Sequence, residues 1–411
     1  MKKTLWTRNY SLLIVSTILG SIGSIAGNFA LSFLVFDETG STLASAMIIA
    51  IQLIPGFVIP LVAAPLMDRF PRKPFLIAGD AVNGVLYLAG GLYLMFCPFT
   101  YIGYLTFSLL LASLQAFDSL AFNSIYPKLI PEGMEQKGYT ISGMLYSVLQ
   151  VIMMPLAAVL LDYFGVAYII IAQGILSIMA AITESFIRVQ EENRMGGEKF
   201  SWKIWVQDIR EAVTYLRNEP GLCGIFNYMA VTNGMATGYS PLLVAYFRVT
   251  AGLTTAMYSL FSVAEFIGRT LGGVLQYNLK TPPKKRFSFA FMVYQIYDCM
   301  DAILLWLPYP VMLLNRGICG FLGVNSATMR QVAVQQYIPE HFRARLNAYQ
   351  SMLILAVGSV LTLLIGLMGE FLDYRVCISV CGAFSLLASW ATIWANRKNV
   401  RKIYETQQTE D

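Results

Sequence analysis

Charged side chains are rare inside the long apolar stretches of the chain, and five of those that occur there stand out. They are Glu265, Arg269, Asp298, Asp301 and Arg316. Placing one such group within a bilayer costs at least about 2.5–3.5 kcal/mol, so each is a candidate for a role that offsets this cost. One such role is a carboxylate that gains and loses a proton as the protein changes conformation. Another is an internal ion pair that makes insertion tolerable.

The spacing of these five residues favours pairing. Glu265 and Arg269 are four residues apart and share a helix face, so they form either a structural pair or a proton-titrating group whose pairing changes with conformation. Asp298 and Asp301 also share a face, and Arg316 falls at nearly the same depth in the next apolar segment, so we expect these three to cluster. Close carboxylates hinder each other's ionisation, which suits a proton carrier, but structural pairing explains the cluster equally well. We take all five as candidates for proton coupling.

The residue types needed for metal binding or nucleophilic catalysis are scarce. The sequence holds one histidine, His341, and six cysteines that lack the spacing of metal ligands. It also lacks the glycine-rich phosphate loop of an ATPase. We therefore expect no catalytic residues, no metal, no cofactor, no nucleic-acid partner and no enzymatic activity.

Composition shows which elements must position these side chains. The 411 residues are 56% hydrophobic and 13% charged, with a mean hydropathy of +0.59, which is too apolar a balance for a soluble surface of this size. A spanning helix needs about 20 mostly apolar residues, and this criterion finds twelve segments. They are 9–36, 42–66, 73–97, 101–127, 138–161, 165–187, 220–247, 251–277, 286–307, 309–336, 344–369 and 374–396.

One long polar stretch divides the twelve segments into two sets of six. It predicts an N-terminal six-helix bundle at 1–187, a cytoplasmic linker with an amphipathic helix at 188–219, and a C-terminal bundle with a cytoplasmic tail at 220–411. Short tripeptides repeat between the halves: Ile-Pro-Glu begins at 130 and 338, and Leu-Asp-Tyr begins at 161 and 372. We therefore predict an all-α membrane protein whose two pseudo-symmetric bundles are related by an axis along the membrane normal, with a substrate site between them.

The distribution of Lys and Arg sets the topology. With the N-terminus inside, 24 of the 29 Lys and Arg fall in cytoplasmic segments and only two, Arg248 and Arg375, on the opposite side. This bias follows the positive-inside rule. It predicts a multi-pass protein of the cell membrane with both termini in the cytoplasm.

The loop at 64–73 carries the most specific motif. It reads Ala-Pro-Leu-Met-Asp-Arg-Phe-Pro-Arg-Lys, with Asp68-Arg69 followed by Arg72-Lys73. This loop resembles the signature loop of the major facilitator superfamily. The resemblance implies that Asp68 and Arg72 latch the cytoplasmic gate by bridging helix ends. An ordinary positive-inside loop would account for the basic residues but not for Asp68.

Other segments resemble the drug:proton antiporter branch of this superfamily, which includes macrolide and siderophore exporters. They are Thr39-Gly40-Ser41, Pro55, Asp80 and the amphipathic stretch 208–217. By this resemblance Asp80 joins the gate motif. Departures from the family pattern occur at Ala64 and Pro71, where glycines are usual, and around Pro155, which lacks the neighbouring glycines of the antiporter motif.

The resemblance also implies which helices line the cavity. In the family these are the first, fourth, seventh and tenth. Polar residues on the corresponding segments can either fix a ligand by hydrogen bonds or bond to a neighbouring helix. The candidates for the substrate cavity are Asn28, Asp118, Asn123, Asn227, Tyr228, Asn233 and Asn325. Asp80, Asp118 and Arg330 lie in the inner thirds of their segments, where a cytoplasmic gate network explains them better than substrate binding does.

These observations predict a secondary active transporter that exports an amphipathic small molecule, drug-like or siderophore-like, by alternating access coupled to protons. One alternative is a facilitator of a lysolipid, peptide or other solute without proton coupling. A second is a transporter-like receptor that binds its ligand without flux. The expected partners are the small-molecule substrate, protons and the lipid bilayer, and we expect a monomer.

Overall fold

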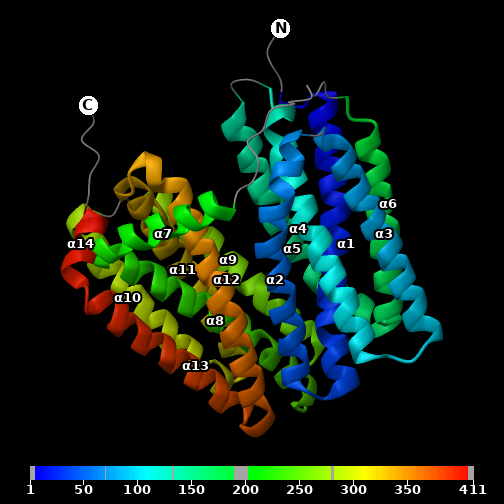
Figure 1. Ribbon diagram of the computed structural model, residues 1–411. Coiled ribbons are helices and arrows are strands. Elements are labelled where there is room, and N and C mark those ends of the chain that lie inside the picture. The colour runs from blue at the N-terminus through cyan, green and yellow to red at the C-terminus, as the bar shows by residue number, and fades with distance from the viewer. Residues whose placement is uncertain (1–4, 70, 132–133, 189–201, 279–281, 406–411) are drawn as a thin grey trace. The chain divides into compact units, whose positions relative to one another are not determined.

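The computed structural model describes residues 5–69, 71–131, 134–188, 202–278 and 282–405, and within these ranges the regular structure is entirely helical (Figure 1). Eleven helices there have 20 residues or more and are long enough to span a bilayer. A twelfth, α13, reaches this length together with the π-helical turn that follows it, whereas α7 and α14 are shorter. The chain is an all-α membrane protein, as the sequence predicted. Its contacts divide it into two compact units.

Unit 1 comprises Met1–Ser41, Ile51–Phe200 and Leu253–Ser259. It holds six long helices, although the first residues of α2, Thr42–Ala50, belong to unit 2. Their bounds are α1 Arg8–Thr39, α2 Thr42–Arg69, α3 Arg72–Phe96, α4 Tyr101–Leu129, α5 Glu135–Phe164 and α6 Val166–Ser185.

Unit 2 comprises Thr42–Ala50, Ser201–Gly252 and Leu260–Asp411. It also holds six long helices, of which α13 continues through a π-helical turn, Ser389–Trp394. Its helices are α7 Trp202–Asn218, α8 Pro220–Val249, α9 Thr255–Asn278, α10 Pro283–Ala302, α11 Tyr309–Tyr337, α12 Glu340–Phe371, α13 Tyr374–Ala388 and α14 Arg397–Glu405, with a 3₁₀ turn at Leu304–Trp306.

The packing order inside unit 1 is repeated inside unit 2. In unit 1, α1 packs on α5 and α6, and α3 packs on α6. In unit 2, the corresponding α8 packs on α12 and α13, and α10 packs on α13. Small residues allow these close approaches: a side chain on Gly84 of α3 would meet the α6 backbone, and one on Gly382 of α13 would meet Ala302 of α10. This repetition agrees with the pseudo-symmetry predicted from the tripeptides.

Hydropathy alone does not identify all twelve long helices. Eight of the described helices are apolar enough to be recognised as membrane spans by length and composition, and α8, α9, α10 and α11 are not among them. These four helices carry the buried carboxylates, arginines, asparagines and tyrosines of unit 2. Their lower hydropathy therefore reflects the polar site that they build.

The segment predicted to be an amphipathic linker helix corresponds to α7. Its residues Ala212 and Leu216 are buried against the rest of unit 2, and the Tyr215 ring stacks on Phe342 of α12 with the ring centres 4.9 Å apart. Glu211 of α7 forms an ion pair with Arg345 of α12, in which Arg345 Nη1 lies 2.6 Å from Glu211 Oε2. The helix is thus fixed to unit 2 along one face, as its amphipathic pattern requires.

Candidate functional site

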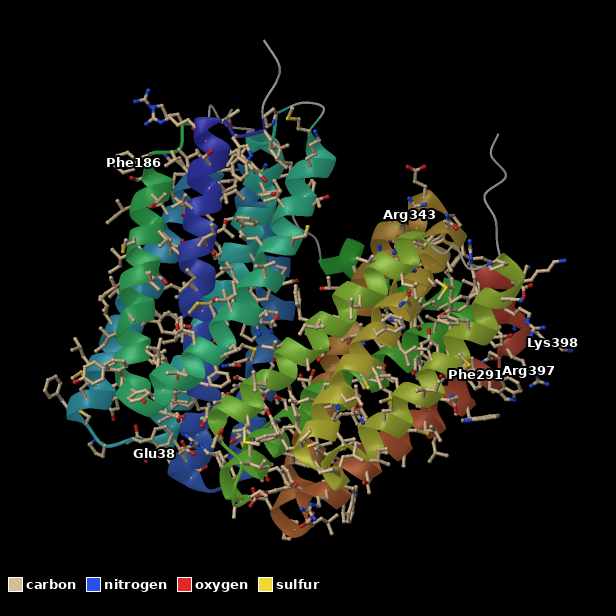
Figure 2. All side chains as sticks on the ribbon, turned by 180° about the vertical axis from the view of Figure 1, so that it is seen from behind. Glu38, Phe186, Phe291, Arg343, Arg397 and Lys398 are labelled. Atoms are coloured by element: carbon tan, nitrogen blue, oxygen red, sulfur yellow. The ribbon has the colours of Figure 1, made fainter. Side chains whose placement is uncertain are left out.

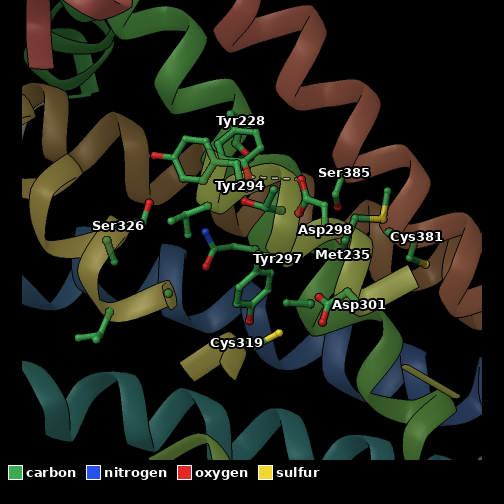
Figure 3. A pocket seen from close by; sticks show the side chains of 18 of the residues that line it. Tyr228, Met235, Tyr294, Tyr297, Asp298, Asp301, Cys319, Ser326, Cys381 and Ser385 are labelled. Atoms are coloured by element: carbon green, nitrogen blue, oxygen red, sulfur yellow. Dashed lines mark hydrogen bonds between the residues drawn. The ribbon is translucent and has the colours of Figure 1, made fainter. Parts of the chain in front are cut away.

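A pocket of about 340 Å³ lies inside unit 2, a size within the range of small-molecule sites (Figure 3). Residues of α8, α9, α10, α11 and α13 line it. Four tyrosines, Tyr228, Tyr239, Tyr294 and Tyr297, supply aromatic walls. The charges of the wall come from three carboxylates and two arginines: Glu265, Asp298, Asp301, Arg269 and Arg330.

Asp301 is the fully paired carboxylate of the pocket. Arg316 of α11 donates to its Oδ1 at 2.6 Å, and the Tyr239 hydroxyl of α8 donates to its Oδ2 at 3.3 Å. Both members of the ion pair are almost completely buried. A buried pair with this hydrogen-bonding holds three helices in register, and breaking it would leave a charge without compensation.

Asp298 lies one turn earlier on α10 and has a different environment. It is 4% exposed, and it accepts one long hydrogen bond, from the Tyr228 hydroxyl to Oδ2 at 3.5 Å (Figure 3). Within the described part of the chain no lysine, arginine or histidine forms an ion pair with it. Of the two neighbouring carboxylates, Asp298 is therefore the one whose negative charge is left for a proton or a cationic ligand.

Glu265 and Arg269 of α9 form the expected pair on one face of the helix. The Arg269 guanidinium donates to Glu265 Oε1 at 2.5 Å, and both residues line the pocket. Their side chains are 28% and 62% exposed, respectively, so this pair lies at the accessible edge of the pocket rather than in its buried part.

Arg330 of α11 is the remaining charge on the pocket wall. It donates to the Tyr294 hydroxyl at 3.3 Å, and its guanidinium carbon lies 5.9 Å from the centre of the Tyr294 ring. The Tyr294 hydroxyl is also 2.7 Å from the Tyr404 hydroxyl of α14. We expected Arg330 at the cytoplasmic gate, and the structure places it at the pocket of unit 2.

Helix geometry explains why these side chains converge. Tyr228 and Tyr239 are eleven residues apart, just over three full turns, so both point from the same face of α8 toward α10. On α10 the two aspartates are three residues apart and face them. Helix α11 also comes close to α9. Gly268 of α9 lies against the α11 backbone, where any side chain would collide with the Gly317 carbonyl.

Four of the five asparagine candidates bond within their own helices. The side-chain amides of Asn233 and Asn325 donate to the carbonyls of Met229 and Phe321, four residues earlier, at 2.8 and 2.7 Å. The amides of Asn123 and Asn227 donate to side chains four residues earlier, in each case over a long distance: Ser119 Oγ at 3.4 Å and Cys223 Sγ at 3.5 Å. The sequence suggested a bound ligand or a neighbouring helix as the partner of these amides. In the structure each of the four amides instead bonds to its own helix.

Two of the seven cavity candidates line the main pocket, and the others lie elsewhere. Tyr228 and Asn233 are in its wall. Asn227 faces a separate small hollow beside α7. Asn325 is buried next to the pocket on α11, while Asn28, Asn123 and Asp118 belong to unit 1.

The gate motif lies at the junction of α2 and α3 in unit 1. The side chains of Asp68 and Arg69 are outside the described part of the structure. Arg72 donates to the Ser124 carbonyl of α4 at 3.1 Å, and Lys73 donates to the Ser185 carbonyl of α6 at 2.8 Å. Both basic side chains thus bind the carbonyl ends of neighbouring helices, where cations are favourable.

Unit 1 contains a second acidic cluster, of which the sequence reasoning found only two members. Asp80 of α3, Asp118 of α4 and Glu184 of α6 are close enough to repel one another. Glu184 is 3% exposed, and its Oε2 and Asp118 Oδ1 have no hydrogen-bond partner among the described residues. No group of three acidic, cysteine or histidine residues in the described ranges is placed to hold a metal ion.

Two residues of these sites, Glu184 in unit 1 and Tyr239 in the pocket, could have been found in the sequence and were missed. Glu184 is an ionisable residue near the end of an apolar segment, so the rule that singled out Glu265 applied to it as well. The eleven-residue spacing of Tyr228 and Tyr239 was a further signal, because tyrosines three turns apart mark one helix face. Nothing in the sequence distinguished Tyr294 and Tyr297 from the abundant tyrosines of the membrane interfaces.

Comparison with known proteins agrees with this architecture. The family model of the Major Facilitator Superfamily matches residues 12–296, which is more than half of the chain. The chain belongs to the major facilitator superfamily. It is therefore a multi-pass membrane protein of a transporter family, as its signature loop suggested.

Individual relatives are distant. Macrolide efflux protein A of Streptococcus pyogenes is 24% identical over 281 residues, a match that covers 66% of this chain and 65% of the relative. The chain thus spans just under two thirds of the length of the curated relatives it matches.

Solved structures share the fold at low identity. A peptide transporter POT in complex with sulfate has a TM-score of 0.73 at 12% identity, and the match covers 98% of both chains. The nucleoside transporter NupG has a TM-score of 0.70 at 11% identity over 98% of this chain and 100% of the other. A bacterial homologue of the human lysosomal transporter Spinster has a TM-score of 0.66 at 13% identity over 98% and 97%. At such identities these structures show a common fold.

Proposed function

We propose that this superfamily member is a secondary active transporter that exports an amphipathic small molecule, drug-like or siderophore-like, by alternating access in exchange for protons. The observation that carries the proposal is Asp298. Its carboxylate is buried in a tyrosine-walled pocket and has no basic partner among the described residues, whereas the neighbouring Asp301 is neutralised by Arg316. A carboxylate in this situation can take up either a proton or a cationic substrate.

The pocket chemistry supports an amphipathic cationic substrate. Aromatic rings attract cations and bury apolar surface, and a single carboxylate at the wall orients a positively charged group. The partial similarity to a macrolide efflux protein supports the direction of transport and the drug-like class. The chain acts as a transporter rather than an enzyme, as a monomer in the cell membrane with both termini in the cytoplasm.

The test is transport by purified protein in vesicles with an imposed pH gradient. A growth screen of an efflux-deficient host against a panel of amphipathic compounds first identifies a substrate. Asp298→Asn should abolish the response of transport to the pH gradient while exchange of substrate for substrate continues. Asp162→Asn is the matched control, because Asp162 is an exposed carboxylate at the end of α5.

The same assay separates proton-coupled export from uncoupled flux. Transport that ignores the pH gradient in the unaltered protein, and that remains unchanged after neutralisation of Glu265, Asp298 or Asp301, would contradict proton coupling and favour a facilitator. Tight binding without any flux would favour a receptor.

A further inference from the structure

A cluster of basic and aromatic side chains lies on the outer surface of unit 2, away from the pocket, where α13 ends and α14 begins. We call it the basic-aromatic patch and define it by Arg397, Lys398, Arg401, Trp390, Trp394 and Phe291. Figure 2 shows Phe291, Arg397 and Lys398 together on one edge of the molecule. The three basic side chains are exposed, as are both tryptophans.

The short helix α14 presents its charges on one face. Val400, Ile403 and Tyr404 are buried, and the Tyr404 hydroxyl reaches Tyr294 of α10, so this side of α14 is fixed to unit 2. Arg397, Lys398 and Arg401 are exposed and share a neighbouring face, because Arg401 is four residues after Arg397 and three after Lys398, and the exposed Lys402 adds a further positive charge. The basic face is therefore held in a fixed orientation rather than carried by a loose tail.

Positive charge outweighs negative charge among the described residues of this face. Glu405 forms an ion pair with Arg401 at 3.7 Å, a long separation at a partly exposed site. Two further lysines, Lys284 and Lys285, are exposed at the start of α10. The Arg401 guanidinium lies 5.4 Å from the ring centre of Phe287, one turn after Lys284, so the basic face of α14 continues toward the basic start of α10.

The aromatic part of the patch is a packed cluster of three rings. The ring centres of Phe291, Trp390 and Trp394 lie 5.0–5.4 Å apart. The Trp390 indole N–H donates to Gln295 Oε1 at 2.7 Å, so its polar atom is satisfied inside the protein and its ring surface faces outward. The π-helical turn that contains both tryptophans closes with a bond from the Ala395 amide to the Trp390 carbonyl at 3.0 Å. Such turns are often found at functional sites.

Charge and apolar surface meet at Trp394. The guanidinium carbon of Arg397 lies 5.2 Å from the centre of the Trp394 ring. A tryptophan cluster directly beside exposed arginines and lysines matches a molecule with an anionic head and an apolar body. In a chain that spans a membrane, a phospholipid is the molecule of this chemistry that surrounds the patch.

We propose that the basic-aromatic patch binds an anionic phospholipid. Its headgroup phosphate contacts Arg397, Lys398 and Arg401, and its acyl chains lie along Trp390, Trp394 and Phe291. The topology predicted from the Lys and Arg distribution puts this end of unit 2 at the cytoplasmic leaflet, and clusters of basic residues just beyond a spanning helix attract anionic lipids there. The proposal is independent of what the transporter carries.

The test uses the purified full chain and an equimolar mixture of phosphatidylglycerol and phosphatidylcholine. Native mass spectrometry counts the lipids that remain bound. The unaltered protein should retain phosphatidylglycerol over phosphatidylcholine by about 30-fold to 150-fold, the preference expected when two or three basic side chains act on one anionic headgroup. The triple variant Arg397→Gln, Lys398→Gln, Arg401→Gln should lose most of this preference.

Two further variants separate a specific site from general charge and from misfolding. Lys137→Gln, Arg188→Gln, Arg210→Gln removes the same charge from exposed positions elsewhere and should keep the preference. Arg397→Lys with Arg401→Lys preserves the charge of the patch and should also keep it.

Three outcomes would overturn the proposal. The first is equal retention of the two lipids by the unaltered protein. The second is an unchanged preference in the triple glutamine variant, which would leave the patch to an acidic protein or a nucleic acid. The third is displacement of the lipid by millimolar inorganic phosphate, which would indicate a site for a free anion.

Discussion

Replacing Asp298 by asparagine is the most informative perturbation of the pocket. Asparagine has nearly the same volume and keeps an oxygen that can accept the hydrogen bond from Tyr228, so the change removes a charge and little else. No basic side chain in the described structure forms an ion pair with Asp298. We therefore expect the variant to fold and to match the thermal stability of the unaltered protein or exceed it.

The structure sets the size of the expected effect on binding. A cationic group placed about 4 Å from the Asp298 carboxylate is attracted by about 4 kcal/mol at an effective dielectric constant of about 20. Desolvation of the cation offsets part of this attraction and leaves about 1.5–3 kcal/mol. Loss of the charge should therefore lower the affinity for a cationic substrate by about 10-fold to 150-fold, and the affinity for an uncharged analogue should stay unchanged.

The assay compares binding and flux in the same preparation. Affinities of a cationic substrate and of its uncharged analogue are measured in detergent by competition, and transport is measured in vesicles with and without a pH gradient. The expected pattern is a selective loss of cation affinity together with loss of the response to the gradient. If the affinities for the cationic substrate and for its uncharged analogue fall equally while the pH gradient still drives transport, Asp298 is a structural residue. The reasoning from its missing ion-pair partner is then wrong.

Three further substitutions test other parts of the structure through thermal unfolding in detergent. Asp301→Asn should destabilise the protein by about 3–5 kcal/mol because Arg316 would remain buried without its anion, and unchanged stability would mean that the pair is not maintained. Gly268→Ala should cost about 1–3 kcal/mol because its new methyl group meets the backbone of α11, whereas Gly273→Ala, with open space around it, should not destabilise the protein. Glu184→Gln should raise the unfolding temperature because burying a carboxyl group near two others costs free energy that a neutral amide does not, and a lower temperature would indicate that the carboxyl group has an essential partner.

Most of the fold could be predicted from the sequence because bilayer thickness fixes helix length. The predicted segments 101–127 and 309–336 correspond to α4 at Tyr101–Leu129 and α11 at Tyr309–Tyr337. Larger differences occur where polar residues extend a helix beyond the apolar core: α12 begins at Glu340, four residues before the predicted start, because Pro339 precedes it as a natural helix start. At the other extreme, α10 ends at Ala302 and a 3₁₀ turn completes the segment predicted to reach 307.

The candidate site was less predictable, because the depth of a charged residue in the bilayer does not determine which residue it pairs with. Sequence spacing correctly brought Asp301 and Arg316 together, but it treated Asp298 and Asp301 as equivalent. Each aspartate accepts a hydrogen bond from a tyrosine of α8, and the difference between them is that Arg316 of α11 reaches Asp301. Such a distinction depends on the rotation of three helices about their axes, and no residue pattern within one helix reports it.

The charge balance of the pocket gives a physical basis for exchange. The pairs Asp301–Arg316 and Glu265–Arg269 each cancel, which leaves Asp298 and Arg330 as the remaining unlike charges on its wall. A proton bound to Asp298 leaves the charge of Arg330 uncompensated, and a cationic substrate bound to the ionised carboxylate does the same. Binding both at once would add a second positive charge in a low-dielectric site, so each ligand opposes the other. Under the proposed function, proton and cationic substrate are then held alternately, which is the condition that an antiporter requires.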